Sequence, residues 1–511
     1  MSASKENFII EIQEGYNFAG TSIVLGGAMY ESTAIPQLQV KAPLRTFNRH
    51  GLVAGATGTG KTKTLQKLSE KLSENGVGVV MLDIKGDFSG ISMPGTMNPK
   101  IEERISVIGD TWNPTGYPVE LMSLSQQDGV RLRATVSEFG PVLLSKILGL
   151  NDTQGSVIAM IFKFCDDNGL PILDLEDLKK VLQYLTGDGK DDLEAQYGMI
   201  SPATIGTIQR KIIELETQGA EIFFGEKSFE VEDFLRKDEQ GRGYIHVVRV
   251  NDIQNQPKLF STFMLQLLAE IYQKMPERGD SDIPELILFI DEAHLVFNEA
   301  SKDLLSQIET IVKLIRSKGV GIFFCTQNPT DIPESVLSQL GMKIQHALRA
   351  FTANDRKAIK MVAENYPETE YYDVDDLITQ LGIGEAFITV LNEKGIPTPL
   401  VHTLMSPPQS RMDVISEAEK NALLQNSHLY HKYKEQVNRE SAYEILSAKM
   451  QNAQAENTSK SKTSKTIPEE KSTVEEVLGN PMVKKFGTTI TREVTRGLMG
   501  ILKSSVKGIF K

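Results

Sequence analysis

The chain has 511 residues, an ordinary globular composition and a formal net charge of −12. That length allows two or three domains, or one large domain with an insertion and a tail. The two cysteines, both in apolar contexts, favour a reducing compartment and indicate no disulfide framework. No secretory signal or apolar run of membrane-spanning length is present. We therefore expect a cytoplasmic protein without a membrane span.

The acidic total also bears on partners. A protein that coats DNA with its outer surface is usually basic. The charge of −12 makes nucleic acid a less expected partner. It does not exclude phosphate contacts that are confined to an inner channel.

The first 40 residues predict a small N-terminal β element. Short apolar stretches at 8–12 and 22–25 are interpreted as strands separated by glycine turns. Residues 41–122 then alternate strand, glycine loop, helix and strand, which is typical of a βαβ unit. We interpret them as the first part of a nucleotide-binding core.

The glycine loop of this unit matches G-x-x-x-x-G-K-[ST], the P-loop motif. Its residues are Gly55, Ala56, Thr57, Gly58, Thr59, Gly60, Lys61 and Thr62. An apolar strand at 52–54 precedes the loop, and leucines at helical spacing follow it. Such a loop turns backbone N–H groups toward phosphate at a helix N-terminus. We expect Lys61 to contact the β- and γ-phosphates and Thr62 to ligate Mg²⁺.

The next strand, at 77–84, ends in a polar turn that contains Asp83 and Lys85. Ligands of open α/β folds bind at this edge of the sheet. The two side chains are candidates to bridge the nucleotide and a partner subunit. A plain strand-to-turn exit explains the turn equally well.

Residues 123–242 predict an α-helical insertion, with apolar stripes at 143–148 and 157–162 and a helix at 204–218. Strand signals return at 244–250, 286–290 and 321–325, so residues 243–408 are interpreted as the second part of the core. This alternation favours a single α/β sheet interrupted by the insertion.

Two of these strands end in polar residues. Asp291 and Glu292 follow the apolar strand at 286–290, and Gln327 follows the strand at 321–325. Asp291 is predicted to hold Mg²⁺, Glu292 to polarise the attacking water, and Gln327 to sense the γ-phosphate. ATP is favoured over GTP because the guanine-specificity motif is missing.

Two arginines are candidates to neutralise transition-state charge. Arg316 precedes the strand that leads to Gln327, and Arg349 follows another strand end. Either one could reach the nucleotide of an adjacent subunit as an arginine finger, and either could be an ordinary surface arginine.

The C-terminal hundred residues change in character. A capping box at 416–419 predicts a polar helix within 409–455, and Ser, Thr and Lys then suggest a flexible linker at 456–472. Residues 473–511 predict a basic amphipathic tail, with seven basic residues against one acid from 482 onward. Docking on a neighbouring subunit is favoured over binding to DNA or a membrane.

Together these motifs resemble the HerA–FtsK superfamily of P-loop motors, and within it the bacterial HerA-like helicases. The carrying segments are 48–62, 82–87, 289–294, 316–321 and 326–329, and the resemblance spans roughly 18–405. It implies a RecA-like core, a ring that is commonly a hexamer, and cargo moved through a channel. It also makes Arg316 the trans-acting arginine, Gln327 the sensor, and a nuclease a partner. Residues 1–40 are short for the N-terminal β-barrel of archaeal HerA.

The leading hypothesis is an ATP-hydrolysing ring motor, a DNA translocase or helicase. One alternative is a nucleotide-gated assembly switch or scaffold with slow ATPase activity. Another is a secretion- or conjugation-type ATPase. DNA as the cargo comes from the family resemblance rather than from these residues.

Overall fold

The structure is a computed structural model that describes residues 3–279, 281–297, 302–350, 352–435, 437 and 439–462. The chain forms two compact units. The first comprises the residues up to Arg131 together with Glu230–Phe260 and Leu267–Lys434. The second comprises Leu132–Phe229, Ser261–Gln266 and the residues from Glu435 onward.

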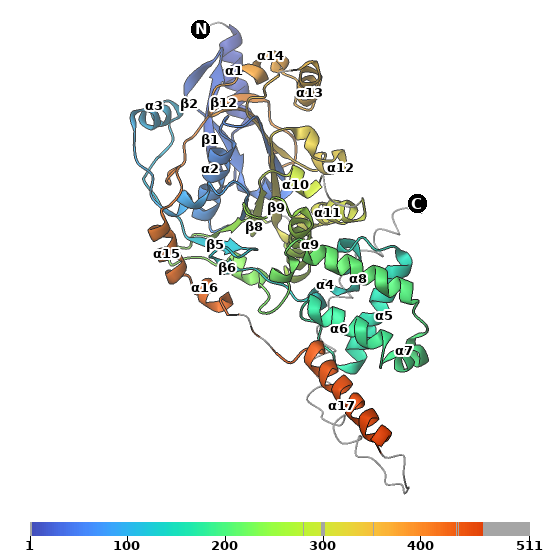
Figure 1. Ribbon diagram of the computed structural model, residues 1–511. Helices are drawn as coiled ribbons and strands as arrows, with labels where there is room; N and C mark the ends of the chain where they lie inside the picture. Colours follow the sequence, from blue (N-terminus) through green and yellow to red (C-terminus); the bar gives the residue numbers. More distant parts are fainter. Residues whose placement is uncertain are drawn as a thin grey trace. The chain divides into compact units, whose positions relative to one another are not determined.

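The first unit is organised by a twelve-stranded sheet (Figure 1) with the order β2-β1-β12-β11-β10-β3-β9-β8-β4-β7-β5-β6. Strands β10 through β6 in this order are parallel, and the pairs that join β2, β1, β12, β11 and β10 are antiparallel. The strands are β1 (Ser22–Tyr30), β2 (Thr33–Pro43), β3 (Gly51–Ala54), β4 (Gly78–Asp83), β5 (Val119–Ser123), β6 (Val130–Arg131), β7 (Ile245–Arg249), β8 (Leu286–Ile290), β9 (Val320–Thr326), β10 (Met342–Gln345), β11 (Glu385–Thr389) and β12 (Val401–Met405). The predicted α/β class with a mostly parallel core is confirmed.

The helices of this unit are α1 (Ala3–Gly15), α2 (Lys61–Glu74), α3 (Pro99–Ile108), α9 (Pro257–Lys274), α10 (His294–Phe297), α11 (Lys302–Ile315), α12 (Glu334–Leu337), α13 (Ala353–Ala363), α14 (Val374–Gln380), α15 (Glu417–Asn426) and α16 (His428–Tyr433). Residues 261–266 of α9 group with the second unit. The leucines of α2 enter the core formed with β3 and β4, where Leu65, Leu68 and Leu72 are buried. This packing fixes the helix that follows the glycine loop.

The N-terminal prediction needs correction. Residues 8–12 lie in helix α1 and not in a strand. A strand would place Phe8, Ile10 and Ile12 on one face, but Ile10 is exposed while the other two are buried at helical spacing. Strands β1 and β2 also extend the main sheet, so residues 1–40 do not form a separate β element.

The second unit is helical, as predicted for the insertion. Its helices are α4 (Val136–Ile147), α5 (Asp152–Asn168), α6 (Leu175–Thr186), α7 (Lys190–Tyr197), α8 (Pro202–Glu216) and α17 (Ala442–Lys462). Its boundaries are narrower than 123–242. Within that predicted range, residues 123–131 and 230–242 belong to the first unit. At the first boundary, β6 pairs with β5 in the sheet.

The C-terminal region also differs from a single polar helix. The predicted capping box is present, with Ser416 accepting from the Glu419 amide. However, α15 ends at Asn426, and Ser427 caps the start of α16. Residues 456–462 of the expected linker continue α17, whereas 463–472 and the basic tail lie outside the described residues.

Candidate nucleotide-binding site

Three neighbouring parallel strands deliver the glycine loop, the acidic pair and Gln327 to one edge of the sheet. β9 lies between β3 and β8, with Ala54 level with Thr326 and Ile290 level with Phe324. The glycine loop follows β3, the acidic pair follows β8, and Gln327 follows β9. Because carboxyl ends of parallel strands share an edge, segments more than 200 residues apart in the chain converge here.

The glycine loop is held on both sides by backbone hydrogen bonds. The Gly55 amide donates to the Thr326 carbonyl (3.2 Å) and the Ala56 amide donates to the Ala347 carbonyl (2.8 Å). Gly55 has φ +151°, and a Cβ there would lie 2.6 Å from the Cβ of His346. This position therefore requires glycine.

Lys61 begins α2 and its side chain is buried in the loop. Its Nζ donates to the carbonyls of Gly55 (2.5 Å) and Ala56 (3.1 Å). Burial lowers the pKa of Lys61, and the charges of Asp291 and Glu292 oppose that shift. The ammonium is thus inside the cradle that the loop amides and the helix N-terminus form. Thr62 is the next residue of the helix.

Asp291 offers an oxygen that suits a cation. The residue is 2% exposed, and its Oδ2 has no hydrogen-bond partner within the described part of the chain. The nearest cation is Lys85, whose Nζ lies 3.9 Å from Oδ2. Burial raises the pKa of Asp291, while the Lys85 charge lowers it. A buried carboxylate oxygen without a donor is the kind of ligand that Mg²⁺ takes, so these residues fit the predicted metal.

Glu292 is the centre of a polar cluster. Lys85 Nζ lies 2.6 Å from its Oε1, and Gln327 Nε2 donates to the two carboxylate oxygens at 3.4 and 3.5 Å. His294 Nδ1 is 3.4 Å from Oε2. Burial raises the pKa of Glu292, but the Lys85 contact outweighs it and the net pKa is lowered. The carboxylate is therefore ionised at neutral pH and can accept a proton.

The backbone at Glu292 is unusual. Its φ is +47°, in the left-handed region that non-glycine residues rarely occupy. Such conformations cost about 1–3 kcal/mol and concentrate at functional sites. The residue with this conformation is the one that contacts Lys85 and Gln327.

Asp83 differs from its neighbour Lys85. Its carboxylate accepts from the amides of Gly86 (2.7 Å), Asp87 (3.3 Å) and Phe88 (3.2 Å). Burial raises its pKa to about 6. Asp83 thus stabilises the turn that follows it, which matches the plain strand-to-turn interpretation. Lys85, in contrast, contacts Asp291 and Glu292.

Arg316 lies at the opposite edge of the sheet. It begins the short turn Arg316–Lys318 before β9, and the seven residues of β9 separate it from Gln327. That separation is about 23 Å at 3.3 Å per residue. Arg349 is exposed at the carboxyl edge, and its Nη1 donates to the Thr379 carbonyl (2.8 Å).

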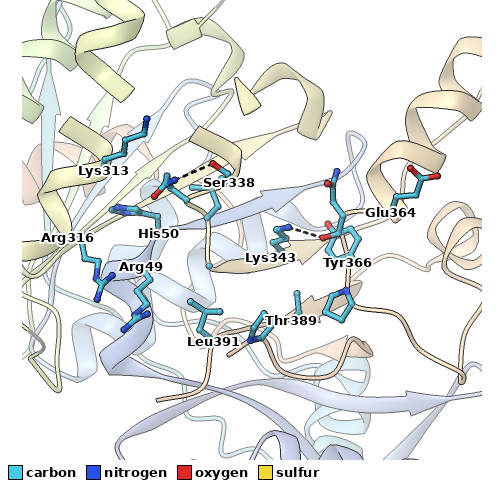
Figure 2. A pocket seen from close by; sticks show the side chains of 16 residues that line it. Arg49, His50, Lys313, Arg316, Ser338, Lys343, Glu364, Tyr366, Thr389 and Leu391 are labelled. Atoms are coloured by element: carbon cyan, nitrogen blue, oxygen red, sulfur yellow. Dashed lines mark hydrogen bonds between the residues drawn. The ribbon is translucent and has the colours of Figure 1, made fainter. Parts of the chain in front are cut away.

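Arg316 is one of the residues that line a cavity of about 540 Å³ (Figure 2). Arg49, Lys313 and Lys343 also line it, with Glu364 as the acidic residue of the lining. The guanidinium groups of Arg49 and Arg316 point the same way in Figure 2. Arg49 is not among the site residues predicted from the sequence. Its signal was available, since Arg49 precedes β3 as Arg316 precedes β9.

Two absences hold for the described residues. No group of three or more His, Cys, Asp or Glu side chains is arranged to hold a metal ion by itself. No helix within the described ranges is long and apolar enough to cross a membrane.

Comparisons with known proteins bear on the family and the fold of the chain. The family model described as "Helicase HerA-like C-terminal" matches residues 30–507. The chain is 22% identical over 375 residues to the DNA double-strand break repair helicase HerA of Sulfolobus acidocaldarius, which covers 71% of this chain and 66% of the relative. It is 24% identical over 379 residues to the protein of the same name from Saccharolobus solfataricus. That match covers 69% of this chain and 63% of the relative. The chain thus spans slightly less than two thirds of these relatives.

Among solved structures, the bacterial conjugative coupling protein TrwBdeltaN70 matches with a TM-score of 0.50 and 14% identity. The match covers 79% of this chain and 93% of that protein. At this level of identity the likeness concerns the fold alone.

Proposed function

The chain belongs to the HerA-like C-terminal helicase family, and from this premise we propose that it is an ATP-hydrolysing ring motor that translocates DNA. One observation carries the proposal. A glycine loop with a buried lysine, an unpartnered buried carboxylate oxygen and an ionised glutamate meet at one sheet edge. That combination supports binding and hydrolysis of a nucleoside triphosphate.

The roles follow from the positions. The glycine loop and the Lys61 ammonium would hold the triphosphate, and Thr62 and Asp291 would hold Mg²⁺. Bound Mg²⁺ would neutralise charge on the phosphate oxygens. Glu292 accepts the proton of the attacking water, and Gln327, within hydrogen-bond distance of Glu292, orients that water.

A ring is part of the proposal because Arg316 is too far from its own nucleotide. An arginine at the amino edge of β9 cannot cross the sheet to the carboxyl edge. In a ring, commonly a hexamer in this family, it contacts the nucleotide of the adjacent subunit. Arg349, at the same edge as its own nucleotide and bonded to Thr379, is the weaker candidate.

DNA is proposed as the cargo because both relatives are named DNA double-strand break repair helicases. A nuclease partner belongs to the proposal through the family resemblance. Both cysteines are free and buried, which supports a reducing, cytoplasmic location.

The direct test measures steady-state ATP hydrolysis with and without duplex DNA. We expect Mg²⁺-dependent turnover that duplex DNA stimulates, and Lys61→Ala should abolish it. Lys100→Ala, at an exposed lysine of α3, is the matched control and should retain full activity. Turnover that survives Lys61→Ala would refute the site. Slow hydrolysis that is indifferent to DNA would favour the assembly switch.

A mixing experiment tests the trans role of Arg316. Arg316→Ala subunits keep an intact glycine loop, and Lys61→Ala subunits keep an intact Arg316. Each variant alone should be inactive. Mixed rings should recover part of the activity, because some interfaces then combine the two intact halves. Absence of recovery in mixed rings of confirmed composition would contradict the trans role.

A further inference from the structure

The proposed chemistry fixes the direction in which ATP lies. Glu292 and Gln327 follow β8 and β9, which lie on one side of β3 in the sheet. The γ-phosphate must face them, since that is where water attacks. β10 and β11 lie on the other side of β3. The nucleoside end therefore leaves the glycine loop on the β10–β11 side.

A turn at residues 382–384, directly before β11, borders the loop on that side. The Gly384 amide donates to the Thr59 carbonyl (3.0 Å). A Cβ placed on Gly60 would lie 3.3 Å from the backbone of Gly384. The turn is thus in van der Waals contact with the glycine loop, although more than 320 residues separate them in the sequence.

The turn is held from two directions. Arg104 donates from Nη1 to the Gly384 carbonyl (3.3 Å) and from Nη2 to the Ile383 carbonyl (3.4 Å). The Gly382 amide donates to Glu385 Oε2 (2.9 Å), and His402 Nε2 lies 2.9 Å from the same oxygen. Its geometry is therefore set before any ligand arrives.

At the tip of this fixed turn, Ile383 is 74% exposed. A single exposed isoleucine is ordinary on a protein surface. Here, however, four hydrogen bonds fix the backbone of the turn that carries this exposed isoleucine, and the turn borders the glycine loop on the side where the nucleoside must lie. Placing a base against it would remove apolar surface of both partners from water.

We propose that Ile383 forms the apolar wall against which the base of the bound nucleotide packs. This inference rests on the proposed function. The wall contributes to affinity and not to the chemical step, because it is on the far side of the loop from Glu292. An aliphatic wall recognises the flat face of a base without reading its edge, so ATP and GTP should gain similarly from it.

The test compares a ligand that has a base with one that has none. Calorimetric titration of the full chain with Mg-ATP and with Mg-tripolyphosphate separates base contacts from phosphate contacts. Ile383→Ala should weaken ATP binding about 3- to 10-fold, since part of one aliphatic side chain's burial is lost. Tripolyphosphate affinity and kcat should stay unchanged.

Two further variants sharpen the comparison. Ile383→Met keeps an apolar side chain of similar volume and should bind ATP as the parent does. Ile396→Ala removes another exposed isoleucine, in the connection between β11 and β12, and should leave both affinities unaltered.

Unchanged ATP affinity in Ile383→Ala would overturn the inference while leaving the proposed function intact. Equal weakening of ATP and tripolyphosphate would also overturn it, because the turn would then act only on the glycine loop. If the parent chain binds neither ligand, the proposed function itself fails.

Discussion

Glu70 is the residue through which the glycine-loop helix holds a distant segment of chain. It is fully buried in α2 and accepts from the amides of Gln409 and Ser410, both at 2.9 Å, and from the Ser410 hydroxyl. Gln66, one helical turn earlier, donates from Nε2 to the Arg411 carbonyl (2.9 Å). Residues 406–411, which we name the strap, are thereby fastened along the helix that starts at Lys61.

Glu70→Ala should destabilise the first unit strongly. It leaves two backbone amides and one hydroxyl buried without an acceptor, and each unmet donor costs about 1–3 kcal/mol. Allowing for water entering the site, we expect a loss of about 3–6 kcal/mol in the free energy of unfolding. The free energy of unfolding of a typical domain is about 5–15 kcal/mol in total, so the substitution should remove a large part of it.

The assay is urea unfolding followed by tryptophan fluorescence. Trp112 is the only tryptophan of the chain, it is buried, and its Nε1 donates to the Pro408 carbonyl in the strap (2.7 Å). Its signal therefore reports on this part of the first unit. Glu103→Ala, at an exposed position of α3, is the control and should change stability by less than about 0.5 kcal/mol. A loss below about 1 kcal/mol for Glu70→Ala would refute the reasoning.

Two further predictions concern chemistry and pH. Glu292→Gln keeps the side chain's size but removes its charge, so hydrolysis should fall about 100-fold or more. ATP should still bind. Single-turnover assays measure the hydrolysis rate and a binding titration measures the ATP affinity. Retained turnover would exclude Glu292 as the base. His246, on β7, has its pKa lowered to about 3 by burial and by the charge of Arg236. Between that value and about 6.5, the unfolded chain binds a proton at this histidine that the folded chain does not. The contribution of His246 to the free energy of unfolding is therefore fully present above this pH window, and within it the free energy falls by about 1.4 kcal/mol per pH unit as the pH drops. His246→Phe should flatten this slope in urea titrations across the window, and equal slopes would contradict the assignment.

Several features were predictable from the sequence because their signals are local. The glycine loop occupies eight consecutive residues, and Asp291 and Glu292 directly follow an apolar strand. The helical character of the insertion and the capping box at Ser416 were likewise readable from short windows. Each depends on neighbours within a few residues, where spacing reflects the local backbone.

The errors also have a local origin. Residues 8–12 are apolar at nearly every position, so the sequence could not distinguish a strand from a helix, and only the exposure of Ile10 decides. The polar residues Lys67 and Glu70 of α2 are buried, with Lys67 paired to Asp110 at 3.0 Å, although polar residues of an amphipathic helix usually face solvent. The strap covers this face of α2, and the sequence of the helix gives no sign of that contact.

By itself, the sequence predicted a glycine loop of the P-loop type and an acidic strand end. Only the tertiary structure decided that Lys85 contacts Glu292, that Arg49 and Arg316 share a cavity, and that Gly384 lies beside Gly60. The reason is physical. Such contacts depend on which strands become neighbours in the sheet, and that order is set by the packing of the whole chain, which no short window of residues encodes.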